Sequence, residues 1–349
     1  MTYFEKAKQK QLALALRGDA VVLSIETSCD ETAAAVVRNG REVLSNAVFT
    51  QIPIHREYGG VVPELASRNH VERITEIVQI ALENAGRTLD TVDAIAVTCG
   101  PGLVGALLVG VSYAKALALS HDLPLIGTNH ILGHIAANYL TFPDLEPPFT
   151  CLIASGGHSH IVRVLDYDKC ELIGKTRDDA AGEAFDKVAR VLGLPYPGGP
   201  ELEKLAATGD PKALVFHSAF NEGDGFDMSF SGLKTAVINV MHTADQKHET
   251  VSRADVAASF QYAVNHILSD KAVRAADGTL ALAGGVSANR NLRDMLSRKC
   301  AAKGIRFCCP DFRYCTDNAA MIGSAAYYLL MKGHLSDLDL NATPYLPIC

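Results

Sequence analysis

Short runs of hydrophobic residues, separated by polar turns, begin the main body of the chain. The runs AVVLSIETS from residue 20, TAAAVVRNG from 32 and EVLSNAVFT from 42 are rich in β-branched residues. This pattern predicts three consecutive strands joined as a meander. From residue 149 the chain repeats the plan with FTCLIASGG, HSHIVRVLD and CELIGKTR. The sequence therefore predicts two copies of one three-stranded unit.

Each predicted meander is followed by alternating strands and helices. In both halves the order is strand, helix, strand, helix. The predicted segments are 92–99, 105–120, 123–129 and 127–138 in the first half, and 278–286, 289–304, 305–310 and 316–332 in the second. A helix-rich insertion, about 177–275, precedes the closing segments of the second half. We therefore expect an α/β protein with two similar lobes and a ligand cleft between them.

Local composition predicts the boundaries between these regions. Residues 1–19 carry lysines and a short apolar run that Arg17 and Asp19 interrupt, so we expect a ragged N-terminal extension rather than a signal peptide. Prolines in FPDLEPPF interrupt regular structure between the halves. The expected organisation is an extension at 1–19, a first lobe at 20–146, a second lobe at 147–330 and a C-terminal tail at 331–349.

Composition indicates an ordinary globular protein. The chain has 349 residues, 48% of them hydrophobic, and a net charge of −7, which argues against a dedicated nucleic-acid scaffold. Its nine cysteines include no C-x-x-C, so we expect free thiols in a reducing compartment. The apolar helix at 105–120 contains Lys115 and many small residues, which suits a buried helix better than a membrane span. We expect a cytoplasmic protein that does not interact with membranes.

Two histidines in NHILGHIAAN are the first candidates for site chemistry. His130 and His134 are spaced i and i+4, so on a helix both imidazoles lie on one face and can reach one metal ion. A zinc protease with H-E-x-x-H places a glutamate where this chain has Ile131. The repeat puts Asp317 at the equivalent helix of the second half. Two imidazoles and a carboxylate predict an open metal site, and two merely structural histidines are the alternative.

An acidic turn and three further motifs leave alternatives open. SIETSCDET gathers Glu26 with other acids, either as a solvated turn or as a site that orients water or a metal-bound phosphate. GPGLVG at 100–105 matches a dinucleotide fingerprint, but the next strand ends without an acid, which favours a packing turn. SGLK at 231–234 lacks the companion motifs of acylating serine enzymes. His158 and His160 share one strand face as structural partners or as ligands.

The second half also contains groups suited to a nucleotide. Asp186 lies on a predicted helix before a Gly-Gly turn that ends at Gly199, and Glu203 follows on the next helix. A carboxylate can accept both hydroxyls of a ribose, and a glycine turn lets a base lie against bare backbone. Asn289, at a predicted helix start, can bond a purine or a phosphate. A helix hairpin without function is the alternative.

The motifs taken together resemble the TsaD/Gcp family. IETSCDET, GPGLVGALLVG, NHILGHIAAN, SGGHS, DDAAGEAFDK, YPGGP, FSGLKTA, AGGVSAN and CTDNAAMIG occur in the family's order from about Val21 to Leu330. The resemblance implies a two-lobed actin/Hsp70/sugar-kinase-like fold, which is a duplicated RNase H-like fold. It also implies transfer of threonylcarbamoyl from threonylcarbamoyl-AMP to N6 of the adenosine adjacent to the anticodon in ANN-decoding tRNAs.

The resemblance further implies a set of site residues, a cofactor and partners. The metal ligands fall on His130, His134 and Asp317, and the nucleotide contacts on Ile153, Ala154, Ser155, Gly156, Gly157, Asp186, Gly199, Glu203 and Asn289. Iron is the expected metal, with zinc, manganese or magnesium as alternatives. The expected partners are tRNA, a TsaB-like paralogue and a TsaE-like ATPase. Glu26 is the candidate general base.

Three other classes of function are compatible with parts of the sequence. An ATPase or small-molecule kinase can have the same fold, because a fold does not determine its chemistry. A metalloprotease would use the two histidines, but the position of its glutamate holds Ile131. A subunit that binds without catalysing would not need both metal and nucleotide motifs in one chain.

Overall fold

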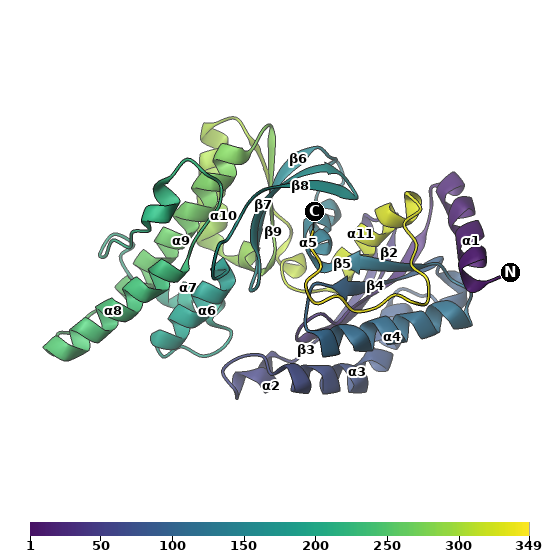
Figure 1. The fold of residues 1–349 in the computed structure, drawn as a ribbon, viewed down its shortest axis with the longest axis horizontal. Helices are drawn as coiled ribbons and strands as arrows, with labels where there is room; N and C mark the ends of the chain where they lie inside the picture. Colours follow the sequence, from purple (N-terminus) through teal and green to yellow (C-terminus); the bar gives the residue numbers. More distant parts are fainter. Residues whose placement is uncertain (349) are drawn as a thin grey trace. The chain divides into compact units, whose positions relative to one another are not determined.

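The chain folds into two compact units, each built around its own sheet. The computed structural model describes residues 1–348. The first unit contains residues 1–147, the short segment 166–169 and the chain from 310 onward; the second contains 148–165 and 170–309. Figure 1 labels the helices and strands of both.

The first sheet has five strands in the order β3-β2-β1-β4-β5. Its strands are β1 (Val21–Glu26), β2 (Glu31–Arg38), β3 (Glu42–Thr50), β4 (Ala94–Gly100) and β5 (Leu125–Asn129). β1 and β2 are antiparallel, as are β2 and β3, whereas β1, β4 and β5 run parallel. Because the parallel strands end at the same edge, the residues that follow them gather there.

Helices cover both faces of the first sheet, which explains why β1 and β4 are buried along their whole length. One apolar core joins the sheet to α3 (Pro63–Asn84) and α4 (Val104–Ser120). The other joins it to α5 (His130–Thr141) and α11 (Ala319–Met331). The short helix α2 (Ile52–Arg56) precedes α3.

The second sheet repeats the topology of the first, in the order β10-β9-β6-β7-β8. Its strands are β6 (Phe149–Ala154), β7 (Ser159–Asp166), β8 (Lys169–Lys175), β9 (Thr279–Ala283) and β10 (Arg306–Cys308). β6 and β7 are antiparallel, and β6 is parallel to β9 and β9 to β10. The predicted duplication of a meander followed by two parallel strands is confirmed.

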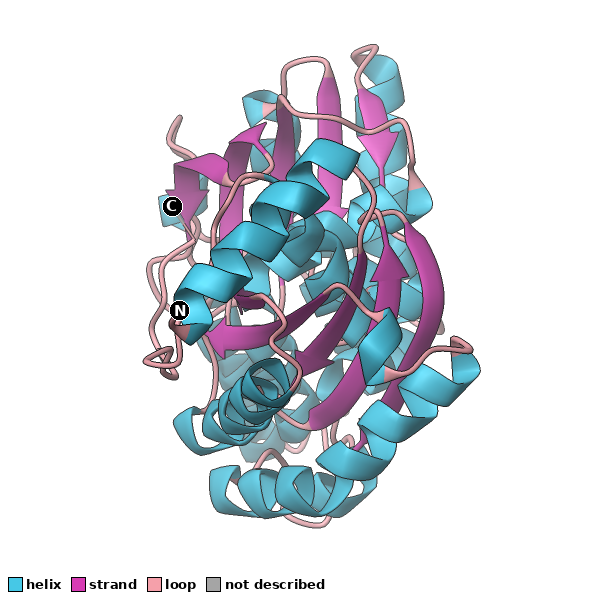
Figure 2. Ribbon diagram, turned by 90° about the vertical axis from the view of Figure 1, so that its right-hand side faces the viewer, coloured by secondary structure: helices cyan, strands magenta, loops and turns pink. Residues whose placement is uncertain are grey.

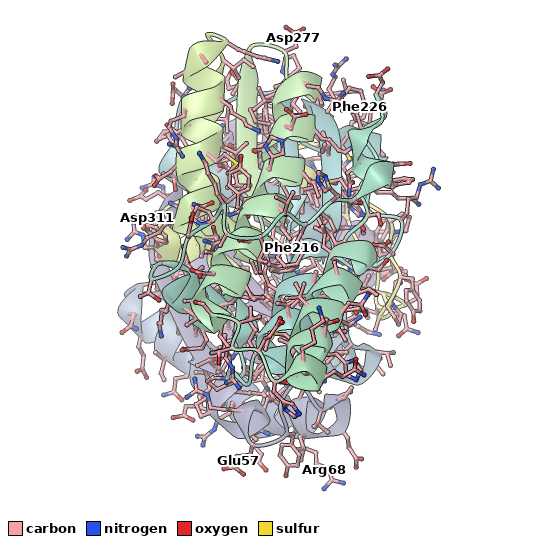
Figure 3. All side chains as sticks on the ribbon, turned by 90° about the vertical axis from the view of Figure 1, so that its left-hand side faces the viewer. Glu57, Arg68, Phe216, Phe226, Asp277 and Asp311 are labelled. Carbon is pink, nitrogen blue, oxygen red and sulfur yellow. The ribbon has the colours of Figure 1, made fainter. Side chains whose placement is uncertain are left out.

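The predicted helical insertion lies between β8 and β9. It contains α6 (Ala181–Val191), α7 (Gly198–Ala206), α8 (Ser231–Lys247) and α9 (Arg253–Ala275), and α10 (Arg290–Ala302) follows β9. A cavity of about 640 Å³ lies against α9, lined by Phe216, Tyr262 and Arg274 among others. Figure 3 labels Phe216 of these residues. None of the site residues expected from the sequence lines this cavity.

Two features of the first unit differ from the sequence expectation. The N-terminal extension is an ordered helix, α1 (Tyr3–Arg17), which Figure 2 shows starting at the N-terminus. A capping box of Thr2 and Glu5 begins it, and its buried Leu14 belongs to the core shared with α11. α11 itself belongs to the first unit, whereas the repeat predicted 310–330 in the second. The reason is its nearly all-apolar sequence, which packs against the first sheet.

The cysteines also differ in part from expectation. Free thiols are found at Cys29, Cys99, Cys151, Cys300, Cys308, Cys309 and Cys315. Cys170 takes part in a disulfide, so the expectation of free thiols fails at that position. Within residues 1–348, no helix is long and apolar enough to cross a membrane.

Candidate metal centre and nucleotide site

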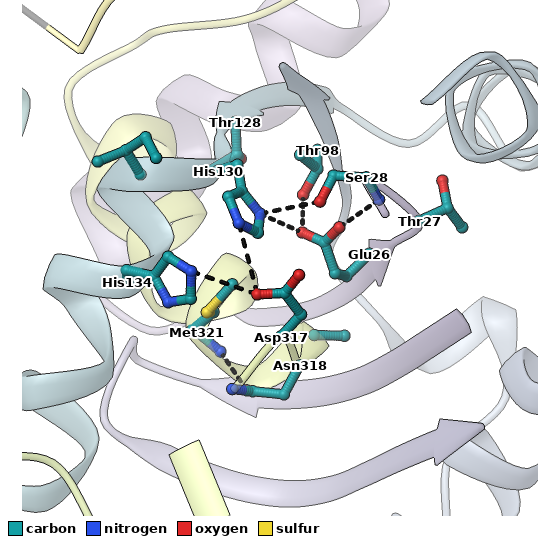
Figure 4. A network of polar contacts seen from close by, with 12 residues as sticks. Glu26, Thr27, Ser28, Thr98, Thr128, His130, His134, Asp317, Asn318 and Met321 are labelled. Atoms are coloured by element: carbon teal, nitrogen blue, oxygen red, sulfur yellow. Dashed lines mark hydrogen bonds and ion pairs between the residues drawn. The ribbon is translucent and has the colours of Figure 1, made fainter. Parts of the chain in front are cut away.

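The N-terminus of α5 places two histidines side by side. β5 ends at Asn129, whose side-chain oxygen accepts hydrogen bonds from the backbone N–H groups of Ile131 (2.8 Å) and Leu132 (3.3 Å). This cap begins the helix at His130. His134 follows one turn later, and the two rings make an edge contact with centroids 4.6 Å apart (Figure 4). The predicted placement of both histidines on one helical face is observed.

Asp317 completes a compact group of possible metal ligands. It precedes α11, which Asn318 begins by accepting a hydrogen bond from the N–H of Met321 (3.0 Å). Asp317 Oδ1 lies 3.5 Å from Nε2 of His130 and 3.3 Å from Nε2 of His134. One ligand atom from each residue lies within 4.8 Å of the others. The structure therefore brings together the three residues that the repeat argument joined.

Glu26 orients His130 from the side opposite Asp317. Its side chain is fully buried, and Oε2 lies 3.0 Å from Nδ1 of His130. Because a carboxylate only accepts, Nδ1 carries a hydrogen toward Glu26, and Nε2 is the ring nitrogen that faces Asp317. Thr98 Oγ1 donates to the same oxygen (2.5 Å), and the N–H of Ser28 donates to Oε1. Both oxygens of Glu26 are thus engaged by groups of the protein.

The charges in this cluster shift the pKa values of its members. Burial acts to lower the pKa of His130, but the carboxylates of Asp317 and Glu26 outweigh it and raise the pKa to about 9. Burial acts to raise the pKa of Glu26, and His130 brings it below its ordinary value. Burial lowers the pKa of His134. The two carboxylates therefore stabilise one positive charge between them.

The acidic turn after β1 is buried rather than solvated. Asp30 is only 7% exposed. Burial, together with the neighbouring Asp30 charge, raises the pKa of Glu31 well above its ordinary value. The interpretation of SIETSCDET as a solvated turn is therefore wrong: Glu26 and Asp30 are buried, and Asp317 contributes to the raised pKa of Glu31.

Of the residues expected to bind a nucleotide, Ile153 to Gly157 lie at and after the end of β6, and Asn289 follows β9, in the second unit. Ile153 and Ala154 end β6 and are fully buried. A Cβ on Gly182, at the start of α6, would lie 2.6 Å from the carbonyl oxygen of Ser155. A Cβ on Gly284 (φ +87°), after β9, would lie 2.4 Å from that of Ala154. Both segments approach the turn after β6 closely because they lack side chains there.

Other glycines of the same region face open space. At Gly156, Gly157, Gly199 and Gly285, no atom lies within 4 Å of where a Cβ would be. Bare backbone is therefore exposed at the turn after β6, at the start of α7 and at the short 3-10 helix η3 (Gly285–Ala288). Such surfaces admit a flat ring or a phosphate close to backbone N–H groups.

The polar residues predicted to contact a nucleotide each hold a helix start. Asp186 Oδ1 accepts from the N–H groups of Gly198 (2.8 Å) and Gly199 (3.2 Å). Glu203 Oε1 accepts from the N–H of Arg290 (2.7 Å), at the first residue of α10. Both carboxylates thus order the segments that carry the predicted site.

Asn289 is held from three sides. It begins α10 by accepting from the N–H of Leu292 (2.9 Å), and its amide is bonded to Asn265 (3.0 Å) and Gln261 (2.9 Å). A cavity of about 610 Å³ adjoins this region and is lined by Glu203, Gln261, Arg290 and Asn291 among others.

Sequence reasoning missed some members of the cluster around His130, whereas its dismissal of SGLK as an acylating motif agrees with the structure. Ser28 Oγ lies 3.1 Å from His130 Nδ1, and its hydroxyl turn was the only signal. In SGLK, Ser231 donates to Asp178 (2.7 Å) and Lys234 pairs with Asp179 (3.2 Å). Because serine and lysine bond different carboxylates, they do not form a nucleophile–base pair. His158 and His160 form an edge contact at 5.4 Å.

Comparison with known proteins identifies the family. The model of the family described as "TsaD: tRNA N6-adenosine threonylcarbamoyltransferase" matches residues 42–324. The chain belongs to the TsaD family. A tRNA N6-adenosine threonylcarbamoyltransferase of Clostridium perfringens (strain SM101) is 58% identical over 331 residues, 93% of this chain and 97% of that protein. One from Clostridium botulinum (strain 657) is 55% identical, over 94% of this chain and 97% of that protein. The predicted resemblance to TsaD proteins is confirmed.

Solved structures support the fold. The crystal structure of HypF from T. kodakarensis superimposes with a TM-score of 0.60 at 15% sequence identity, covering 92% of this chain and 49% of that one. At this identity the likeness shows the fold alone. The predicted α/β fold with two actin-like and sugar-kinase-like lobes is confirmed for this TsaD chain.

Proposed function

We propose that this chain is the tRNA N6-adenosine threonylcarbamoyltransferase of its organism. It would transfer threonylcarbamoyl from threonylcarbamoyl-AMP to N6 of the adenosine adjacent to the anticodon in ANN-decoding tRNAs. Membership of the TsaD family, at 58% identity to a relative of that name, carries this proposal. In the reaction the N6 nitrogen forms a bond to the carbamoyl carbon, the carbon–oxygen bond to AMP breaks, and the amine loses one proton.

We further propose that His130, His134 and Asp317 hold one divalent metal ion. The fit is supported by their ligand atoms, which lie within 4.8 Å of one another, and by Glu26, which fixes the tautomer of His130. The cation would take the place of the proton on His130, because both neutralise the same carboxylates. Iron is the proposed metal from the family resemblance, and zinc or manganese also suits two imidazoles and a carboxylate, with magnesium a further alternative. When bound, the ion would supply positive charge for oxygen atoms of the donor.

The glycine surfaces of the second unit are the proposed site of the adenylate. Ile153 to Gly157 would provide backbone groups, and the open faces of Gly156, Gly157 and Gly199 leave room for a ligand. Asp186, Glu203 and Asn289 order these segments through the hydrogen bonds described above. We propose that Asp186 and Glu203 also accept ribose hydroxyls and that Asn289 bonds the base or phosphate.

Glu26 remains the proposed acceptor of the proton released by N6. Its oxygens already accept hydrogen bonds from Ser28, Thr98 and His130. Because the carboxylate is fully buried, a proton would reach it through the hydroxyl of Thr98, since the Ser28 donor is a backbone N–H and His130 is assigned to the metal.

We propose that tRNA modification also needs a TsaB-like paralogue and a TsaE-like ATPase. The 32 Lys and Arg of this chain are outnumbered by 39 Asp and Glu, so its net charge of −7 disfavours holding a polyanion by itself. Apolar side chains exposed on neighbouring helices support a protein partner: Val71 on α3 is 64% exposed and Val104 on α4 is 51% exposed. Such a pair of helices suits packing against helices of a similar fold.

The test is to incubate the protein and these partners with unmodified tRNA and threonylcarbamoyl-AMP. The tRNA is then digested and the nucleosides are separated. Threonylcarbamoyladenosine that appears only with all substrates supports the proposal. Hydrolysis of ATP by this chain alone, without tRNA and without modified nucleoside, would instead support the kinase or ATPase alternative.

A further inference from the structure

The end of the chain is built into the first sheet. We call residues 336–347 the C-terminal strap. It begins beside β5, where the N–H of Ser336 donates to the carbonyl of Leu125 (2.8 Å), and continues past Lys115, whose ammonium donates to the carbonyl of Leu340 (3.1 Å). In Figure 1 its yellow trace runs past β4 and β5 to the C-terminus.

Three hydrogen bonds attach the last part of the strap. The N–H of Thr343 donates to the carbonyl of Cys99 (2.7 Å), and the N–H of Gly102 donates to that of Pro344 (3.2 Å). The side-chain Nδ2 of Asn129 donates to the carbonyl of Pro347 (3.0 Å). These three partners lie at or just beyond the carboxyl ends of β4 and β5.

The strap fits closely against this edge of the sheet. A Cβ on Gly100 would lie only 2.0 Å from the carbonyl oxygen of Thr343. The backbone of the strap therefore occupies space that any other residue at position 100 would fill. Such close packing is expected of a segment with one defined place, not of a loose tail.

Each attachment point of the strap lies next to His130 or to a residue of the hydrogen-bond network around it. Cys99 follows Thr98, which donates to Glu26. Gly102 packs on Ser28, because a Cβ there would lie 2.6 Å from the carbonyl oxygen of Ser28, and the next N–H, of Leu103, donates to that oxygen (2.8 Å). Glu26 and Ser28 both lie against Nδ1 of His130.

Asn129 makes the most direct of these connections. One end of its amide caps α5 by accepting from Ile131 and Leu132, and the other end donates to Pro347. Because an amide group is planar, the bond to Pro347 fixes the direction of the oxygen that caps the helix. His130 is the next residue and the first of that helix.

We propose that the C-terminal strap positions His130 for metal binding and that Asn129 transmits this effect. The inference rests on the proposed metal site and adds a determinant of its affinity. The strap also adds to stability, since Leu340 and Leu346 pack on the apolar core of the first unit. The experiment must therefore separate positioning from stability.

Two changes remove the connection in different ways. Asn129→Ser keeps an oxygen that can cap α5 but lacks the amide donor to Pro347. Deletion of residues 344–349 removes the carbonyls of Pro344 and Pro347 but retains the bonds of Ser336, Leu340 and Thr343. Tyr345→Ala is the matched control, because this strap side chain is 93% exposed.

Metal-free proteins are titrated with Co²⁺, which reports affinity by calorimetry and geometry by visible absorption. We expect Asn129→Ser and the deletion each to weaken cobalt binding by about tenfold or more and to shift the absorption bands. The combined variant should be no weaker than the deletion alone, because both remove one connection. Thermal unfolding of the metal-free proteins measures the separate loss of stability.

Two results would overturn the proposal. The first is that Asn129→Ser leaves the cobalt affinity and the spectrum unchanged. The second is that the combined variant loses cobalt affinity by the product of the two single fold-changes. If the unaltered protein does not bind cobalt, the metal part of the proposed function fails. Hydrogen exchange then tests whether the strap positions the start of α5. The amides of Ile131 and Leu132 should exchange faster in the deletion variant, and equal rates would refute positioning.

Discussion

The two sheets have the same topology, but the residues that follow their first strands are different. β1 ends in the buried Glu26, and Ser28 follows within hydrogen-bond distance of His130. β6 ends in Ala154, and the following Gly156 and Gly157 face open space. One copy of the duplicated unit thus gathers charged and polar side chains at the strand ends, while the other leaves backbone bare.

This difference shows how one fold provides two kinds of site. Side chains that converge on one point suit a small cation, because each supplies one ligand atom. Bare backbone suits a larger planar or phosphate-bearing ligand, because nothing prevents close approach. If the first copy serves a metal and the second a nucleotide, changes in one should affect one ligand and spare the other.

The largest effect is expected at His134. His134→Ala removes one of two imidazoles without breaking a hydrogen bond of Nδ1, which has no partner among the described residues, although it leaves a cavity where the buried ring was. We expect metal content after purification to fall below a tenth of the unaltered level and transfer to be abolished. Binding of an adenylate analogue should be unchanged. His121→Ala, a partly exposed histidine paired with Asp90, is the control; equal metal content in both variants would exclude the site.

A smaller effect on the same ligand is expected at Glu26. Glu26→Gln preserves the shape of the side chain. In the unaltered protein both carboxylate oxygens accept hydrogen bonds, so the amide NH₂ of the glutamine must face a hydrogen-bond donor. The orientation of His130 weakens as a result, and metal affinity should fall about 10- to 100-fold. Metal titration of the folded variant measures this change. An affinity within twofold of the unaltered protein would mean that Glu26 does not orient the ligand.

The sequence predicted the candidate metal ligands, because their positions depend on local spacing and on the repeat. The i, i+4 spacing of His130 and His134 places them on one helical face wherever that helix packs. The repeat of the strand pattern brought in Asp317, which is far away along the chain. Both steps needed only periodicity and chain order, and the structure brings these three residues together.

The features that the sequence did not predict depend mainly on packing between segments that are distant in sequence. Nothing in AIAVTCG marks Thr98 as a partner of Glu26, because their contact follows from the parallel pairing of β1 with β4. The strap was predicted only as a tail, since its backbone bonds leave no periodic pattern. The helix at the N-terminus did have a readable signal, the capping box from Thr2 to Glu5, which its lysine-rich composition obscured.

The second copy is tested at Asp186. Asp186→Ala removes an acceptor of the N–H groups of Gly198 and Gly199, together with the proposed partner of the ribose. Losing a charged hydrogen-bond partner costs about 1.5–3 kcal/mol, so affinity for an adenylate analogue should fall roughly tenfold to a hundredfold. Metal content should stay unchanged, the reverse of the result for His134→Ala. Calorimetry with both ligands would contradict the division of roles if Asp186→Ala lost metal instead.

The smallest effect concerns a carboxylate that holds the insertion of the second copy. Asp178 accepts from Ser229, Phe230 and Ser231, just where α8 begins. Burial acts to raise the pKa of Asp178, but these hydrogen bonds outweigh it, and the pKa lies below its ordinary value. A lowered pKa means that the charged form stabilises the fold above about pH 4 and that this contribution is lost as the pH falls through the pKa of the folded state.

Asp178→Asn should therefore lower the melting temperature by a few degrees at neutral pH, in keeping with about 1 kcal/mol for exposed hydrogen bonds. The difference from the unaltered protein should stay constant from pH 7 to about pH 5 and then shrink toward zero in acid. Asp224→Asn changes an exposed carboxylate of the same insertion and serves as the control. Metal and nucleotide binding should remain unchanged, because Asp178 lies in neither set of site residues. A difference in melting temperature that grows toward acid pH would contradict the assigned role, since it would mean that the charge of Asp178 opposes folding.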